Sequence, residues 1–94
     1  MDIARSDIVK STAGRDKGKL FFVLDLEGDF LLLADGKGRR IECPKRKKRK
    51  HAVFAARIGC RTADKIRSGE KITNSELRRT LAQFGGDSDQ DQEG

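Results

Sequence analysis

The apolar residues of this chain lie in short segments that glycine-containing turns separate. The longest uninterrupted apolar runs, such as residues 30–34, have only five residues. A helix that crosses a membrane needs roughly 18 consecutive apolar residues. A segment of about five residues is also too short for a helix, but it is long enough for a strand. The pattern therefore predicts a small domain built mainly from β-strands and excludes a transmembrane helix.

Three of these segments are predicted to be strands because β-branched, aromatic and leucine side chains fill them and turn residues flank them, and a fourth strand is predicted after the turn that follows the third. The predicted strands are residues 7–12, 20–26, 30–34 and 39–43. In the second strand one predicted face holds Leu20, Phe22, Leu24 and Leu26, and the other holds Phe21, Val23 and Asp25. Asp35-Gly36 predicts a tight turn before the fourth strand, and Pro44 predicts that strand's end.

Four strands within about forty residues bury little surface as an open sheet, so we expect them to curl into a small five-stranded, SH3-like barrel. A fifth strand near residues 51–54 would complete the barrel. Two interpretations of residues 51–58 stay open. Their apolar residues alternate as in a strand, but their alanines are also compatible with a helix.

One or two short helices are predicted after the strands. Thr73 and Glu76 have the spacing of a capping box, and Leu77, Leu81 and Phe84 then recur on one helical face until Gly85-Gly86. We expect this face to pack on the barrel and Arg78 and Arg79 to point to solvent. A shorter helix is predicted at residues 63–68, between Thr62 and Gly69. The predicted organisation is a barrel at 1–58, a helical extension at 59–84 and a tail at 85–94.

Length and composition argue against an enzyme. The 94 residues suit one small domain, and a hydrophobic content of 35% supports a small core rather than a large catalytic cavity. Residues 14–19 resemble a phosphate-binding P-loop, but only three residues separate the glycines and Leu20 follows the lysine. No nucleophile, base and orienting group can be assembled around His51, the single histidine. We therefore expect no catalytic residue, no cofactor and no small-molecule substrate.

The cysteines indicate reduced thiols rather than a disulfide or a metal site. The first residues contain no apolar segment typical of a secretory signal, so we expect a cytoplasmic protein in which Cys43 and Cys60 stay reduced. Their spacing with His51 lacks a Cys-x-x-Cys pair and a fourth ligand. No metal site is predicted.

The net charge of +6 is distributed very unevenly. Residues 37–50, here called the basic segment, carry nine cations against Glu42 alone. They include six consecutive cations, residues 45–50, with no apolar side chain among them. We expect this run to be either solvated or neutralised by a polyanion. Nucleic acid is the favoured polyanion because each neutralised phosphate releases counterions. No amphipathic stripe or lipidation signal supports a membrane surface.

The last ten residues, 85–94, contain four carboxylates and no hydrophobic side chain. Nothing in them offsets the entropy lost on ordering, so we expect a disordered acidic tail. Two roles stay open: the tail is solubilising, or it folds over the basic segment and competes with weakly bound RNA.

One stretch of the chain resembles a known RNA-binding element. Residues 7–24, DIVKSTAGRDKGKLFFVL, are similar to a KOW motif, a strand–loop–strand unit whose hallmark Lys-Gly step matches Lys17-Gly18. The basic run that ends at His51 and the helix near Thr73 extend the likeness to small bacterial KOW-domain proteins. These are relatives of KOW-containing large-subunit ribosomal proteins.

The resemblance implies an SH3-like barrel that binds RNA, in particular ribosomal RNA, through the first loop and the basic segment. Two glycines let the loop approach an RNA strand while neighbouring cations contact phosphates. The candidate RNA-binding residues are Gly14, Arg15, Lys17, Gly18, Lys19, Lys37, Arg39, Arg40, Lys45, Arg46, Lys47, Lys48, Arg49, Lys50 and His51. Because the chain has no Tyr or Trp, we expect recognition of RNA shape and phosphates rather than stacking on bases.

Two functional classes follow. The first is a non-enzymatic RNA-binding protein that associates with the ribosome and has RNA and ribosomal proteins as partners. The second is an SH3-like adaptor that binds proteins of the translation or transcription machinery, with its cations merely solvated. Partners that survive removal of RNA by nuclease would favour the adaptor.

Overall fold

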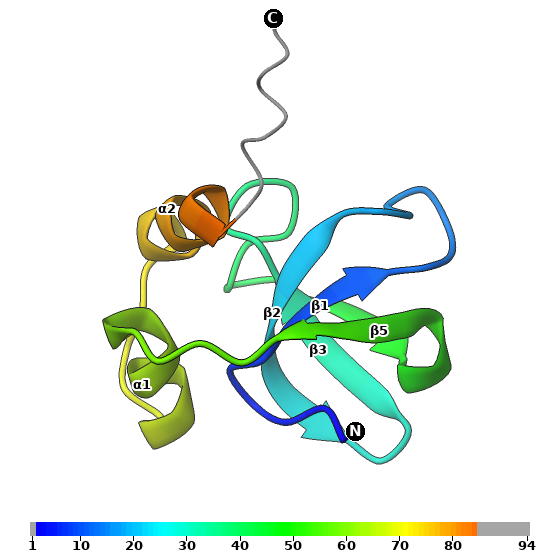
Figure 1. The fold of residues 1–94 in the computed structure, drawn as a ribbon, viewed down its shortest axis with the longest axis horizontal. Helices are drawn as coiled ribbons and strands as arrows, with labels where there is room; N and C mark the ends of the chain where they lie inside the picture. The colour runs from blue at the N-terminus through cyan, green and yellow to red at the C-terminus, as the bar shows by residue number, and fades with distance from the viewer. Residues whose placement is uncertain (1, 85–94) are drawn as a thin grey trace, which may run out of the picture.

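A computed structural model of the chain describes residues 2–84. Five strands come first and two α-helices follow (Figure 1). The elements are β1 (Ile8–Ser11), β2 (Leu20–Glu27), β3 (Phe30–Ala34), β4 (Lys45–Lys48), the 3-10 turn η1 (Arg49–His51), β5 (Ala52–Ala56), α1 (Arg61–Ser68) and α2 (Asn74–Phe84). The prediction of a mainly β fold with helices after the strands is confirmed. The predicted acidic tail, 85–94, lies outside the described residues.

The five strands form one antiparallel sheet in the order β4-β3-β2-β1-β5. From β1 to β4, strands that are consecutive in the chain pair with each other and are joined by the loop 12–19, the turn 28–29 and the loop 35–44, whereas β5 returns to pair with β1. The segment 51–58, which was compatible with either a strand or a helix, therefore contains a strand. Strand β4 is left at one edge of the sheet and β5 at the other.

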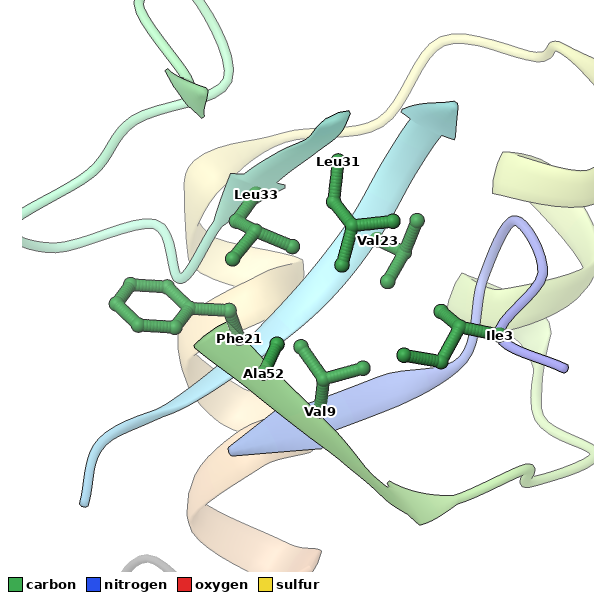
Figure 2. Packing of buried hydrophobic residues seen from close by; sticks show 7 residues of the cluster. All are labelled: Ile3, Val9, Phe21, Val23, Leu31, Leu33 and Ala52. Atoms are coloured by element: carbon green, nitrogen blue, oxygen red, sulfur yellow. The ribbon is translucent and has the colours of Figure 1, made fainter. Parts of the chain in front are cut away.

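One face of the sheet holds an inner apolar cluster (Figure 2). Its buried members are Ile3, Val9, Phe21, Val23, Leu31, Leu33 and Ala52. They come from four strands and from the N-terminal segment, and Figure 2 shows their side chains pointing toward one another with strands on both sides of them. The sheet is therefore strongly curved around this cluster.

The opposite face of the sheet is covered by the helices. Ile66 of α1 and Leu77 and Leu81 of α2 are buried against Ile8 and Phe22 of the sheet. Figure 1 shows both helices on one side of the strands. The apolar face that was predicted for residues 73–84 thus packs on the sheet, although Phe84 at the end of α2 remains 38% exposed.

A register shift in β2 divides its apolar residues differently from the predicted alternation. Leu20 and Leu24 pack with the helix-facing cluster, as Phe22 does, but Leu26 packs against the inner cluster. The pairing of β2 with β3 shifts between Val23 and Asp25, and one extra residue in a strand reverses the face of every later side chain. The prediction that Leu26 shares the face of Phe22 is therefore wrong.

The two helices begin and end where the local sequence signals lie. At α2 the Thr73 N–H donates to Glu76 Oε1 at 2.9 Å, and the Glu76 N–H donates to Thr73 Oγ1 at 3.2 Å, which confirms the capping box. The short helix α1 is also confirmed, but it begins two residues earlier than the predicted start at residue 63. Its cap is Cys60, whose sulfur accepts from the Ala63 N–H.

The predicted strand at 39–43 is wrong, because these residues form a loop and β4 begins after Pro44. Backbone N–H groups of this loop donate to side chains instead of to the backbone of β3. The Asp35 carboxylate accepts from the Lys37 and Arg39 N–H groups, both at 2.9 Å, and Asn74 at the start of α2 accepts from the Ile41 N–H at 2.8 Å. Pro44 therefore precedes the fourth strand and does not end it.

Candidate nucleic-acid interface

Three separate segments carry the predicted RNA-binding residues: the first loop (residues 12–19), the 35–44 loop, and β4 with η1. Most of these residues are exposed, whereas Lys45, Arg49 and His51 are half-buried and Lys47 is buried. The exposed ones are Gly14, Arg15, Lys17, Gly18, Lys19, Lys37, Arg39, Arg40, Arg46, Lys48 and Lys50.

The first loop is a fixed turn rather than a loose connection. Gly14 and Gly18 have φ of 82° and 89°, a region that residues with a Cβ rarely adopt. The Gly18 N–H donates to the Ser11 carbonyl at 2.8 Å, and the Lys19 N–H donates to the Asp16 carbonyl at 2.9 Å. Arg15 and Lys19 are therefore held on a defined backbone.

Lys47 is turned into the protein by a carboxylate of the first loop. Its ammonium donates to the Ala13 carbonyl at 3.0 Å and to Asp16 Oδ1 at 3.4 Å. Side chains alternate along a strand, so Arg46 and Lys48 remain exposed on either side of it. The expectation that a polyanion or solvent neutralises the whole run 45–50 is wrong for Lys47, which Asp16 neutralises instead. Lys47 consequently has little ammonium surface to offer a phosphate.

Asp16 links the first loop to β4. Its Oδ1 accepts from the Ser11 hydroxyl at 2.9 Å, and its Oδ2 lies 3.5 Å from the Lys45 ammonium. Burial alone would raise the pKa of Asp16. The Ser11 hydrogen bond and the charges of Lys47 and Lys45 outweigh burial and hold the pKa below its usual value of 3.8. Asp16 is thus an ionised internal partner of the strand that carries the densest positive charge.

The first loop, the 35–44 loop and β4 meet around one pocket of about 280 Å³. Its lining residues are Arg15, Asp16, Lys19, Phe21, Asp35, Gly38, Arg39 and Lys45. Both carboxylates already serve the protein: Asp16 pairs with the two lysines, and Asp35 accepts from the backbone of its own loop. Within residues 2–84, Arg15, Lys19 and Arg39 have no ion pair. The pocket therefore presents three unneutralised cations from two loops.

The structure brings only part of the predicted set together in this pocket. Arg15, Lys19, Arg39 and Lys45 line it, whereas Lys37 and Arg40 are exposed elsewhere on the 35–44 loop. Of the two organising carboxylates, Asp16 was not among the predicted site residues, and Asp35 was predicted only as part of a turn. The only signal for Asp16 was a single carboxylate among the cations of the first loop, and its partner on β4 could not be read from that.

The remaining chemical groups show no assembled metal centre. Cys43 and Cys60 are free thiols, and no group of three or more potential metal-ligating side chains was found among residues 2–84. In the same part of the chain, no helix is both long enough and apolar enough to span a membrane.

Comparisons with protein-family models and with curated proteins found no match to this chain.

Proposed function

We propose that this protein is a non-enzymatic RNA-binding module that contacts structured RNA, in particular ribosomal RNA, in the cytoplasm. The observation that carries the proposal is the convergence of Arg15, Lys19, Arg39 and Lys45 on one pocket from three segments of the chain. Guanidinium and ammonium groups that meet in this way suit phosphate oxygens. The KOW-like Lys17-Gly18 step lies in the loop that supplies two of these cations.

We also propose that the curved sheet is an SH3-like barrel of the KOW type. The support is the order of its five antiparallel strands, in which β5 returns to pair with β1, and the position of the KOW-like loop between β1 and β2. This arrangement places the first loop beside the edge strand β4, as the Asp16–Lys47 ion pair requires.

An RNA phosphate backbone explains the concentration of charge better than solvation alone. Each Lys or Arg that neutralises a phosphate releases condensed counterions, so the affinity gained accumulates with every contact and declines with salt. Apolar surface for a protein partner is sparse in the described residues, where Val53 and Phe84 are the large hydrophobic side chains with substantial exposure. The proposal is therefore an RNA-binding protein rather than an adaptor.

The test compares two triple variants that remove the same number of charges. The first changes the pocket cations: Arg15→Gln, Lys19→Gln and Arg39→Gln. The control changes exposed cations of the helical region: Arg61→Gln, Lys71→Gln and Arg79→Gln. RNA affinity is measured against salt concentration with a structured ribosomal RNA fragment. We expect the pocket variant to lose at least tenfold in affinity. The slope of log affinity against log salt concentration should also become less negative, by about 0.7–0.9 for each lost phosphate contact.

The control variant should retain most of the affinity, because its cations lie on other elements. Equal losses in the two triple variants would show that net charge alone attracts RNA and would contradict a site at the pocket. Binding that does not depend on salt would contradict phosphate recognition. Protein partners captured equally well before and after nuclease treatment would support the adaptor instead.

A further inference from the structure

A second pocket lies at the other end of β4 and contains an aromatic side chain. Its volume is about 520 Å³, and its lining residues are Asp29, Phe30, Lys48, Arg49 and Lys50. Lys45 lines the first pocket and Lys48 lines the second, so about three strand residues, or roughly 10 Å of backbone, separate these two lysines along the edge of the sheet. Side chains three residues apart on a strand point to opposite faces, so the two lysines lie on opposite sides of this edge strand.

Phe30 is the aromatic residue that lines this pocket. The Arg46 guanidinium lies over the ring at 4.0 Å from the centroid, and it is held there by an ion pair with Glu27 at 3.3 Å. Phe30 lines the second pocket and Arg46 does not. A planar group in the pocket can pack against the Phe30 side chain.

Arg49 adds a donor at the same place. Its backbone N–H donates to the Asp29 carbonyl at 2.8 Å, which ties η1 to the turn between β2 and β3. Its side-chain Nε is buried and has no hydrogen-bond acceptor within residues 2–84. Buried donors are normally paired, and Arg49 is also one of the residues that line the pocket, so its guanidinium lies beside the space that a ligand would fill.

We propose that the second pocket receives an unpaired nucleobase of the bound RNA. An aromatic ring for stacking, a guanidinium donor and two flanking lysines, Lys48 and Lys50, match a base together with the phosphates beside it. This inference rests on the proposed RNA-binding function and deepens it. The absence of Tyr and Trp suggested recognition of shape and phosphates only, whereas Phe30 adds a stacking surface.

The test uses two RNA hairpins that differ by one nucleotide. One hairpin is fully paired and the other carries a single bulged nucleotide, prepared in turn with each of the four bases. Stacking on an aromatic side chain corresponds to a gain of about fivefold or more in affinity. We expect the bulged hairpin with at least one of the bases to bind at least fivefold more tightly than the paired hairpin. This ratio should change little with salt, since both hairpins share the phosphate contacts.

Variants then assign the preference to the pocket. Phe30→Leu keeps apolar bulk but removes the ring, and Arg49→Lys keeps the charge but removes the guanidinium, so both should bring the affinity ratio close to one. Phe30→Trp should retain the ratio. The matched controls are Phe84→Leu and Arg61→Lys, which make the same changes at exposed positions on α2 and α1. Circular dichroism verifies that each variant is folded.

A base analogue gives a direct signal. With 2-aminopurine in the bulge, binding should change the fluorescence of the wild-type complex, and Phe30→Leu should abolish that change. Equal binding of all bulged and paired hairpins, or a preference that Phe30→Leu leaves intact, would overturn the second pocket as a base site while leaving phosphate binding in place. Failure to bind any hairpin would overturn the proposed RNA-binding function and this inference with it.

Discussion

Single carboxylates decide how the cations of this protein are presented. Asp16 neutralises Lys47 and approaches Lys45, so a run of six cations is not uniformly exposed. Asp7, which is fully buried, binds the Arg57 guanidinium through two hydrogen bonds of 2.8 and 2.9 Å and joins the end of β5 to β1. This contact raises the pKa of Arg57. At the residue scale, the surface charge is therefore set by a few internal ion pairs.

Replacing Asp16 by Asn should destabilise the fold. The change leaves the Lys47 ammonium, whose side chain is only 7% exposed, without its carboxylate, and we expect a loss of about 2 kcal/mol in the free energy of unfolding. Denaturant titration at pH 7 measures this loss. The control is Asp2→Asn, an equal change at an exposed position, which should alter stability by less than about 0.5 kcal/mol. Equal effects of the two changes would contradict the structural role of Asp16.

The stabilisation by Asp16 should depend on pH with a definite sign. Its pKa is lower in the folded protein than its usual value of 3.8, so its contribution is complete above that value and disappears as the pH falls through the folded-state pKa. The difference in unfolding free energy between wild type and Asp16→Asn should be largest near neutral pH and should shrink below pH 3.8. A difference that stays constant or grows in acid would contradict a lowered pKa.

At the scale of elements, the 35–44 loop is positioned by α2. Arg78 donates to the Gly36 carbonyl at 2.6 Å, and Asn74 accepts from the Ile41 N–H. Arg78 and Arg79 are exposed, as expected, but Arg78 also holds this loop. The helix thus fixes the loop that brings Arg39 to the first pocket.

Gly36→Ala and Gly28→Ala together distinguish the effect of the close contact with α2 on stability from the effect of backbone strain alone. Gly36 has φ of 78°, and a Cβ there would collide with the Asn74 carbonyl oxygen of α2. Gly28 also has a positive φ, 60°, but a Cβ there meets no atom within 4 Å. Strain alone costs about 1 kcal/mol. We therefore expect Gly28→Ala to lose about 1 kcal/mol and Gly36→Ala at least about 3 kcal/mol in denaturant titrations. Similar losses at both glycines would contradict the close contact between the loop and α2.

At the scale of the whole molecule, the net charge of +6 averages a strongly basic region and four carboxylates at 87–93. Removing residues 85–94 raises the net charge to +10. We expect association with RNA to become severalfold faster at low salt and nearly unchanged at high salt, because long-range electrostatic steering is screened. Stopped-flow measurement at two salt concentrations tests this.

A full-length variant with Asn and Gln in place of the four tail carboxylates is the control for chain length. It should match the truncated protein, since the expected effect comes from charge alone. An acceleration that persists at high salt, or one seen only after truncation, would contradict the electrostatic explanation.

Local signals predicted the elements whose hydrogen bonds and apolar faces are specified within a few residues. The capping box at Thr73 and Glu76 and the three apolar segments that became β1, β2 and β3 belong to this group. The fourth strand was placed wrongly at 39–43 because alternation and a turn signal do not show which backbone groups a distant helix will bind. Asn74 lies 33 residues from Ile41 and takes the hydrogen bond that a strand would have needed.

By itself, the sequence determined a small, mainly β chain with a capped C-terminal helix and a concentrated basic segment, since composition, periodicity and local capping are properties of neighbouring residues. Only the tertiary structure decided which cations face solvent and which segments meet. Lys47 is buried because Asp16, 31 residues away, lies opposite it. The first pocket exists because two loops and an edge strand converge. Burial and charge pairing depend on contacts between distant residues, and only the folded chain specifies those contacts.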